Sequence, residues 1–151
     1  MSRRASRRHS FIVTYLSEFH GDISISQLLD SYMEEFVLPE STATSAPVDI
    51  EFIKTQVHGI HEQCAFIDEI ITRYITGWSF SRIAKIDLAI LRLAIYELAF
   101  MPEIPTKVCI NEAVELAKTY GDDDAPAFVN GLLANAQKEL RGDPDPLTTK
   151  P

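Results

Sequence analysis

The sequence predicts an all-α protein, and three observations support this prediction. Residues 82–100 contain no Gly or Pro, and their apolar side chains point almost all the way round a helix, as in a helix buried inside a bundle. Residues 50–74 place apolar side chains at alternating steps of three and four, the spacing of one helical seam. No segment reads as a strand. We therefore expect a bundle of about six or seven helices with residues 82–100 at its centre.

Length and composition indicate one ordinary globular domain. The 151 residues are 46% hydrophobic and 24% charged, which suffices for a sizeable core. The chain has neither the apolar run of a transmembrane helix nor the apolar core of a secretory signal, so we expect a cytoplasmic protein without a membrane segment. Cys64 and Cys109 fall on apolar helix faces and are expected to be reduced and buried. We expect the domain to cover residues 1–141 and a disordered tail to cover residues 142–151.

The first helix is expected to start at Ser6 and to end at Gly21, with residues 1–5 outside it. Its predicted buried face consists of Phe11, Ile12, Tyr15, Leu16 and Phe19. The first fifteen residues contain four arginines and no acid, although the whole chain has a net charge of −8. Arginines at the positive end of a helix dipole work against local stability. The start is therefore either a solvated basic terminus or an anion-binding arm, and we favour the arm.

Two more helices are expected before the central one. Ser24 or Ser26 caps the first of them, and its apolar side is formed by Leu28, Leu29, Tyr32, Met33 and Phe36. Residues 38–49 are rich in Ser, Thr, Ala and Pro and predict an exposed loop within the domain. Residues 50–74 then predict a single long helix, whose seam is formed by Ile50, Ile53, Val57, Ile60, Cys64, Ile67, Ile71 and Tyr74.

The central helix is expected to stop before Pro102 and Pro105, because proline lacks the N–H that a helix interior needs. A helix follows up to Tyr120, with Gly121 as its C-cap. Its predicted buried residues are Ile110, Ala113, Val114 and Ala117. The acids 122–124 and a proline in the first turn favour the start of a last helix, which is expected to bury Val129, Leu132, Leu133, Ala136 and Leu140.

No pattern in the chain points to catalysis. His58, His61 and Glu62 lie within about one turn of each other, but they do not form the HExxH arrangement, and no third ligand is apparent. We therefore expect solvated side chains and no metal at this place. The sequence has no Gly-rich phosphate loop, no GxSxG elbow and no CxxC pair, so neither an enzyme nor a cofactor is expected.

Three residues of the later helices have two interpretations each. Asp87 lies on an apolar wall of the central helix, where a carboxylate needs a partner, either a basic residue of another helix or a docked protein. Gly131 costs about 1 kcal/mol relative to Ala inside a helix, which close approach of a second helix or of a ligand would explain. Phe128, at the edge of an apolar stripe, either packs in the core or stacks on an RNA base.

Three segments resemble the NusB family. They are RRASRRHSFIVTYLSEF at 3–19, RIAKIDLAILRLAIYEL at 82–98 and IPTKVCINEAVELAKTYGDDDAPAFVNGLL at 104–133, of which the third is the most specific. The resemblance implies two small helical bundles packed across each other. It also implies a transcription antitermination factor that binds the boxA RNA of rRNA leader transcripts. The implied partners are NusE, which is also a ribosomal protein, and the RNA polymerase antitermination complex.

The resemblance also assigns residues. Arg3, Arg4 and Arg7 match the family's arginine-rich RNA-binding start. Arg8 and His9 add basic character where relatives often carry an acid and a small residue. Positions near the RNA-facing end of the later helices are matched by Lys107, Asp124, Phe128 and Asn130. Tyr15 and Asp87 match the side that docks NusE, which would explain a carboxylate on an apolar wall.

Two alternatives stay open at this point. Some relatives are dimers whose contact surface hides the RNA arm, so a structural helical homodimer is the first alternative. The same helical domain also resembles the N-terminal part of certain rRNA cytosine methyltransferases, which makes an accessory rRNA-binding module the second. We expect no fused methyl-donor domain, because the chain is too short to hold one.

Overall fold

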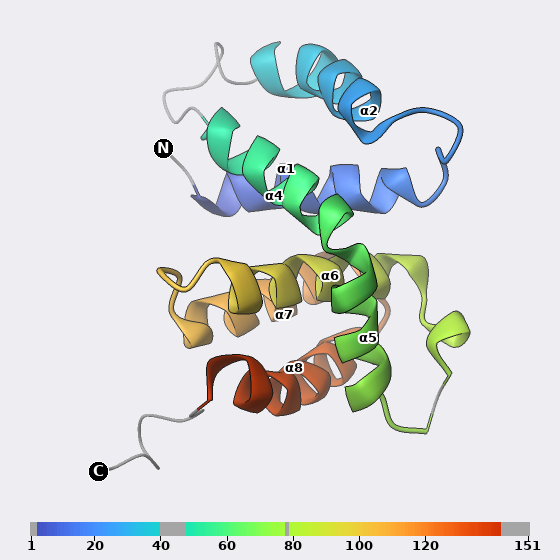
Figure 1. Ribbon diagram of the computed structural model, residues 1–151, viewed down its shortest axis with the longest axis vertical. Coiled ribbons are helices and arrows are strands. Elements are labelled where there is room, and N and C mark those ends of the chain that lie inside the picture. The colour runs from blue at the N-terminus through green and yellow to red at the C-terminus, as the bar shows by residue number, and fades with distance from the viewer. Residues whose placement is uncertain (1–2, 40–47, 78, 143–151) are drawn as a thin grey trace. The chain divides into compact units, whose positions relative to one another are not determined.

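The computed structural model describes residues 3–39, 48–77 and 79–142, and its regular elements within these ranges are all helices (Figure 1). This confirms the predicted all-α class. The chain divides into two compact units, residues 1–62 and 63–151, and each unit is described by itself. A single domain over residues 1–141 stays a prediction. The predicted disordered tail lies, apart from Gly142, outside the described residues.

The first unit contains α1 (Arg3–Ser17), α2 (Ile25–Tyr32), a π-helical turn η1 (Met33–Val37) and α4 (Ile50–Glu62). Helix α1 packs on α2 and α4, and α2 packs on α4 as well. The core residues of this unit are Val13, Leu28, Leu29, Tyr32, Met33, Val37, Val48, Ile53 and Val57. Because Val48 is buried, the predicted exposed loop ends before this residue. Residues 40–47 of that loop lie outside the described residues.

Helix α1 begins three residues earlier than the sequence predicts and ends at Ser17. Residues 3–5 therefore form its first turn. Phe11 is buried as predicted, but Phe19 is 55% exposed. Phe19 lies beyond the end of the helix, so the helical spacing that predicted its burial no longer applies. Small polar side chains, Ser6, Ser10 and Thr14, are buried along the helix instead.

Helix α2 starts where the sequence predicts, at the Ser24 cap. The Ser24 hydroxyl accepts the Gln27 N–H at 3.0 Å, and the Gln27 side chain accepts the Ser24 N–H at 3.0 Å, which is a complete capping box. The helix continues into the π turn, where the Leu38 N–H donates to the Met33 carbonyl five residues back. The wider turn changes the helical phase, so Val37 is buried and Phe36 is 52% exposed. The predicted burial of Phe36 is therefore wrong.

The second unit contains α5 (Cys64–Tyr74), a 3₁₀ turn η2 (Phe80–Arg82), α6 (Lys85–Phe100), α7 (Thr106–Tyr120) and α8 (Ala125–Arg141). Helix α6 packs on α5, α7 and α8, and α8 packs on α5 and α7. All residues from Leu88 to Leu98 are buried, which confirms the prediction of a central helix. The helix begins at Lys85 rather than at Arg82, because the 3₁₀ turn and the extended residue Ile83 precede it.

The predicted single helix over residues 50–74 is interrupted. Gln63 adopts φ −101° and ψ 17° between α4 and α5, so the two helices are separate. The seam divides accordingly: Ile53 and Val57 belong to the core of the first unit, whereas Ile67 and Ile71 are fully buried in the second. The apolar spacing of the sequence holds on both sides of the break. The residues on the two sides, however, pack into two separate cores and do not form one seam along a single helix.

Gly121 is the C-cap of α7, as the sequence predicts, whereas Gly131 lacks one of its two expected explanations. Gly121 is extended, at φ −92° and ψ −179°. A Cβ atom at this position would lie 2.5 Å from the Ala125 Cβ and 3.0 Å from the Ala117 carbonyl oxygen. Close packing, rather than a left-handed cap, therefore requires this glycine. A Cβ atom on Gly131 would meet no described heavy atom within 4 Å, so close approach of a helix does not explain that residue.

Several expectations about burial and membranes can be compared with the described residues. Ile110, Val114 and Leu140 are only partly buried. Cys109 is buried as predicted, but Cys64 is partly exposed, and neither forms a disulfide within the described part of the chain.

None of the described helices combines the length and apolar content that a membrane crossing requires. No described cluster of three His, Cys, Asp or Glu side chains could hold a metal ion.

Candidate nucleic-acid interface

The first candidate surface is the arginine-rich start of α1. The first turn of this helix contains two arginines and no acid, so positive side chains add to the positive end of the helix dipole. Arg3 and Arg4 are exposed and Arg8 is partly exposed. Arg7 is only 5% exposed. Of the four arginines predicted to contact RNA, three therefore reach solvent in this structure.

Two of these arginines lie over one aromatic ring of α4. The Cζ atoms of Arg3 and Arg7 are 4.1 and 5.8 Å from the centroid of the Phe52 ring, and Phe52 itself is 5% exposed. Arg3 also forms an ion pair with Asp49, at 3.6 Å between Nη2 and Oδ2. The start of the chain is therefore held against α4 by a cation–π contact and a carboxylate. The sequence does not single out Asp49 or Phe52 in this role.

His9 does not contribute basic surface, contrary to the expectation from the sequence. Its ring is 4% exposed, and its Nδ1 atom lies 2.7 Å from the Tyr32 hydroxyl. The two rings meet edge to face, with centroids 5.6 Å apart. A buried ring in this arrangement joins α1 to α2. His9 is therefore part of the packing of the first unit rather than of its solvent-facing charge.

The second candidate surface is a cavity of about 120 Å³ in the second unit. It lies where the start of α6 meets the turn between α7 and α8. Its described lining is formed by Arg82, Ile83, Ala84, Asp87, Asp122, Asp124, Ala125 and Phe128. Carboxylates accept hydrogen bonds and an aromatic ring can stack on a base, so this cavity suits a planar group that carries N–H donors.

Asp122 organises the turn that forms the cavity. Its Oδ1 atom accepts the backbone N–H groups of Asp124 at 3.0 Å and of Ala125 at 3.1 Å. It therefore supplies acceptors to the N–H groups that the start of α8 leaves unpaired. Asp124 itself makes no side-chain cap bond, so its carboxylate stays on the surface beside Phe128. The run of three acids in the sequence indicates a helix start, but not which acid forms the cap.

Asp87 shares this cavity with Asp124 and Phe128, although the resemblance assigns it to a different site. Burial, and next the charge of Asp122, raise the pKa of the Asp87 carboxyl above its ordinary value. No ion pair to Asp87 forms among the described residues. The interpretation as an internal ion pair is therefore wrong. The neighbouring carboxylate instead makes the charged form of Asp87 less favourable.

The remaining predicted site residues lie outside the described lining of this cavity. Lys107 on α7 and Asn130 on α8 are both exposed. Phe128, which does line the cavity, is partly exposed. Tyr15 of α1 is partly exposed and stacks on Phe11, with ring centroids 6.5 Å apart. The structure therefore places Asp124 and Phe128 together, and leaves Lys107 and Asn130 on the surfaces of their helices.

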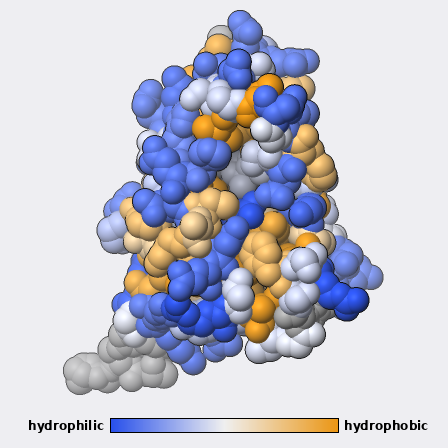
Figure 2. Space-filling model, turned by 45° about the vertical axis from the view of Figure 1, so that its right-hand side comes forward, coloured by the Kyte–Doolittle hydropathy of each residue, from blue (hydrophilic) through white to orange (hydrophobic). Residues whose placement is uncertain are grey.

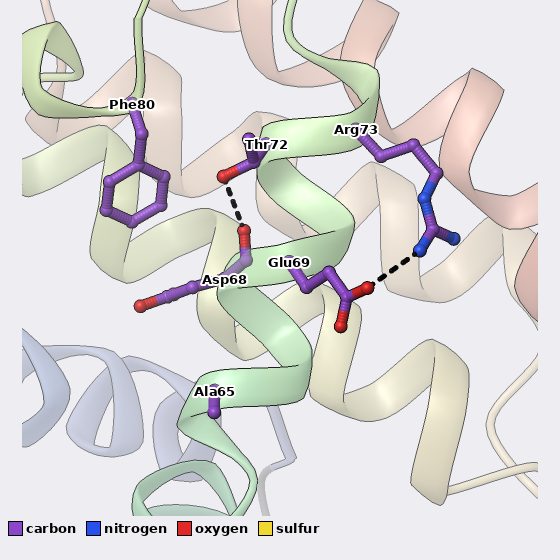
Figure 3. A pocket seen from close by; sticks show the side chains of 6 residues that line it. All are labelled: Ala65, Asp68, Glu69, Thr72, Arg73 and Phe80. Atoms are coloured by element: carbon purple, nitrogen blue, oxygen red, sulfur yellow. Dashed lines mark hydrogen bonds and ion pairs between the residues drawn. The ribbon is translucent and has the colours of Figure 1, made fainter.

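A larger groove runs along α5, beside the 3₁₀ turn (Figure 3). Its described lining is formed by Ala65, Asp68, Glu69, Thr72, Arg73 and Phe80. The polar side chains of this groove already bind neighbours in the second unit. Arg73 pairs with Glu69 and with Glu139, and Thr72 donates to the Asp68 carbonyl at 2.8 Å. Its chemistry therefore indicates a ligand less clearly than the acidic cavity does.

The face drawn in Figure 2 shows no single dominant apolar site. On the face drawn in Figure 2, hydrophobic side chains reach the surface in several areas that are separated by hydrophilic ones. Large exposed hydrophobic residues include Phe19, Phe36, Phe66 and Phe100. Scattered apolar exposure of this kind is common in soluble proteins. The arginine-rich arm and the acidic cavity are therefore the better-defined candidate sites.

Comparisons with known proteins agree with the resemblance found in the sequence. The model of the NusB family matches residues 4–138. The transcription antitermination protein NusB of Agathobacter rectalis is 41% identical over 134 residues, which cover 89% of this chain and 98% of the relative. The structure of NusB from T. maritima has a TM-score of 0.80 and 35% identity, and the match covers 92% of each chain.

A second solved structure contains partners. It is a crystal structure of the antitermination factors NusB and NusE in complex with dsRNA. The matched chain has a TM-score of 0.77 and 26% identity to this protein, with 91% of this chain and 96% of that chain covered. The similarity therefore extends over almost the full length of both proteins.

Proposed function

Because this chain belongs to the NusB family, we propose that it is a transcription antitermination factor that binds boxA RNA of rRNA leader transcripts together with NusE. The observation that carries this proposal is the nearly full-length similarity to NusB proteins, one of them in a complex with NusE and RNA. As part of an RNA polymerase antitermination complex, the protein acts in the cytoplasm. It acts by binding RNA and protein and is not an enzyme.

The arginine arm supplies the phosphate contacts in this proposal. Guanidinium groups bind phosphate oxygens through paired N–H donors, and Arg3 and Arg4 are exposed at the start of α1. The partly exposed Arg8 adds a third positive group, whereas the buried Arg7 adds only its positive charge near Phe52. Such contacts make affinity depend strongly on salt.

The acidic cavity supplies base recognition in this proposal. Asp124 can accept hydrogen bonds from the amino group of a base, while Phe128 stacks on the base plane. Both side chains line the same cavity. Lys107 and Asn130 are exposed and would contact the adjoining phosphates and bases. An unpaired stretch of RNA is the substrate class that leaves base edges and base faces open for these contacts.

NusE docks through Tyr15 and Asp87 in this proposal. The Tyr15 ring lies between those of Phe11 on α1, at 6.5 Å, and the exposed Phe19 beyond the end of the helix, at 5.1 Å between centroids. Asp87 is partly exposed, burial and the charge of Asp122 raise the pKa of its carboxyl, and no compensating ion pair to it forms among the described residues. A basic group of the partner would supply that compensation. NusE and RNA would then strengthen each other's binding, because linkage is reciprocal.

We expect the double change Arg3→Ala and Arg4→Ala to weaken binding of a boxA RNA oligonucleotide about tenfold at moderate salt. Two lost phosphate contacts should also reduce the slope of log affinity against log salt by about 1.4, because each contact to single-stranded nucleic acid contributes roughly 0.7. Fluorescence anisotropy at several salt concentrations measures both quantities.

The matched control for this double change is Lys54→Ala, which removes an exposed positive charge from α4 of the same unit. It should change affinity much less than the double change does. Equal affinities and equal salt slopes for the unmodified protein and the double variant would remove the arm from the interface. Circular dichroism confirms that each variant keeps its helices.

We expect Asp87→Asn to stabilise the protein at pH 7 and to weaken NusE binding about tenfold. The pKa of Asp87 is raised in the fold by burial and by Asp122, so the folded state prefers the neutral carboxyl. That preference contributes stability below the ordinary Asp pKa, and the contribution is lost as pH rises through the raised pKa. Asparagine is uncharged at every pH in this range, so the variant does not lose stability as the pH rises.

Thermal unfolding from pH 3 to pH 7 measures this effect. The melting temperature of Asp87→Asn should exceed that of the unmodified protein at pH 7, and the difference should vanish as pH falls through the raised pKa. Asp123→Asn, which changes an exposed acid outside the described cavity lining, should show no comparable gain. Lower stability at pH 7 together with unchanged NusE binding would contradict both roles of Asp87.

A further inference from the structure

Asp49 makes three contacts at the point where the start of α1 meets the start of α4. Its Oδ1 atom accepts the Phe52 N–H at 3.1 Å, which caps α4. Its own N–H donates to the Ser6 hydroxyl at 2.8 Å. Its Oδ2 atom lies 3.6 Å from Nη2 of Arg3. Because the first two contacts hold the residue in place, its second carboxylate oxygen is kept beside the arginine arm.

The Arg3 guanidinium is held on two different sides. Its Cζ atom lies over the Phe52 ring, 4.1 Å from the centroid, and its Nη2 atom lies 3.6 Å from Oδ2 of Asp49. A cation–π contact uses the face of a guanidinium, whereas carboxylates and phosphates bind its N–H groups in the plane. The Asp49 carboxylate therefore competes with a phosphate for the Nη2 end of the Arg3 guanidinium.

We infer that Asp49 pairs with Arg3 in the unbound protein and that an RNA phosphate replaces Asp49 as the partner of the guanidinium, which stays over the Phe52 ring. This inference rests on the proposed RNA-binding function. Asp49 is thus a self-pairing contact that lowers the affinity of the arm for phosphate.

The geometry makes this exchange easy. The 3.6 Å separation is longer than the roughly 2.8 Å of a strong charge-assisted hydrogen bond. The Arg3 side chain is 53% exposed, and exposed ion pairs are weak. The cap to Phe52 does not depend on the ion pair, since it uses the other carboxylate oxygen. Asp49 therefore stays in place when Arg3 turns to a phosphate, and its charge then opposes the bound RNA.

Asp49→Asn tests the inference, because asparagine keeps an oxygen that can cap α4 and removes only the charge. We expect this variant to bind a boxA RNA oligonucleotide about two- to fivefold more tightly than the unmodified protein at moderate salt, the range set by a weak exposed ion pair. Asp49→Ser, which keeps a capping hydroxyl without a charge, should show the same direction of change.

The gain must act through Arg3. In a protein that already carries Arg3→Ala, adding Asp49→Asn should raise affinity no more than Glu51→Gln does. Glu51 is an exposed acid on the same helix, so its change controls for the general effect of one negative charge less. Double-mutant cycles from anisotropy titrations give the coupling between Asp49 and Arg3 directly.

Three outcomes would overturn the inference: unchanged or weaker RNA binding by Asp49→Asn, a gain equal to that of Glu51→Gln, or a gain that persists without Arg3. Thermal unfolding checks that each variant is folded before it is scored. A folded, unmodified protein that does not bind the RNA contradicts the proposed function itself. That result is separate from a failure of the inference, which compares variants of a protein that does bind.

Discussion

Replacing Arg141 with methionine is expected to lower the free energy of unfolding by about 3 kcal/mol, because charged hydrogen bonds contribute roughly 1.5–3 kcal/mol each and are not additive. The guanidinium donates to the Leu98 carbonyl at 2.7 Å, to the Glu97 carbonyl at 3.1 Å and to the Met101 carbonyl at 3.3 Å. It also donates to the Thr106 hydroxyl at 3.2 Å.

These contacts explain the size of the expected effect. The Leu98 carbonyl cannot receive the N–H of the residue four positions on, because that residue is Pro102, and a positive charge at a helix C-terminus is favourable. Arg141, the last residue of α8, therefore caps α6 and joins it to the start of α7. Methionine fills part of the volume but donates nothing, so the Leu98 carbonyl loses the donor that Arg141 supplies, and the Glu97 and Met101 carbonyls keep only the N–H groups of Met101 and Ile104.

Chemical denaturation measures the change. Lys138→Met, which removes an exposed positive charge from the last turn of α8, is the matched control and should cost less than about 0.5 kcal/mol, as surface substitutions usually do. Arg141→Lys keeps the charge but lacks the planar set of donors, so it should recover only part of the loss. Equal stability of Arg141→Met and Lys138→Met would contradict the capping role.

Replacing Asp68 with alanine is expected to lower the free energy of unfolding by about 3 kcal/mol, the lower end of the cost of breaking a buried ion pair. Asp68 of α5 accepts two hydrogen bonds from Arg92 of α6, each 2.9 Å long. The side chain of Arg92 is only 9% exposed and that of Asp68 is 27% exposed. The alanine would leave a buried guanidinium without its carboxylate.

Two further variants test this explanation. Glu69→Ala removes the neighbouring acid, whose partner Arg73 is 44% exposed, and should cost less than about 1 kcal/mol, as surface ion pairs do. Adding Arg92→Met to Asp68→Ala should restore part of the stability, because an apolar side chain suits a buried position better than an unpaired charge. If the double variant is less stable than Asp68→Ala alone, the uncompensated charge is not the cause.

Much of the secondary structure followed from local patterns. The Ser24 cap, the end of α6 before Pro102 and the end of α7 at Tyr120 agree with the sequence. These signals act through the backbone of a few neighbouring residues, so no distant contact is needed to interpret them. Residues 88–98 are buried throughout, as a helix that is apolar on every side must be.

The errors occur where a local pattern meets a change of geometry. The π turn displaces Phe36 from the core, and the break at Gln63 divides a seam that is regular in the sequence. Periodicity shows which residues share a face, but it assumes that one helix continues. A single residue with non-helical φ and ψ interrupts the helix, although the spacing of the apolar residues around it stays unchanged.

The candidate site was predicted only in part. The resemblance identifies Asp124 and Phe128, and the structure shows them in one cavity with Asp87 and Asp122. Asp122 was not predicted as a site residue, because an acid before a helix usually acts as a solvated cap. The sequence predicts Arg7 and His9 as basic surface residues, yet both are buried. Arg7 lies near Phe52 and His9 lies against Tyr32, and both of these partners come from helices far along the chain.

The sequence by itself determined the all-α class, the central helix, the arginine-rich start and the membership of the NusB family, because all of these depend on local pattern or on residue identity. Only the tertiary structure decided which arginines reach solvent, that Asp49 pairs with Arg3, and that Asp87 and Asp122 share a cavity. These facts depend on distances between residues that are far apart in the sequence. Such distances are set by the packing of whole helices, to which every core side chain contributes.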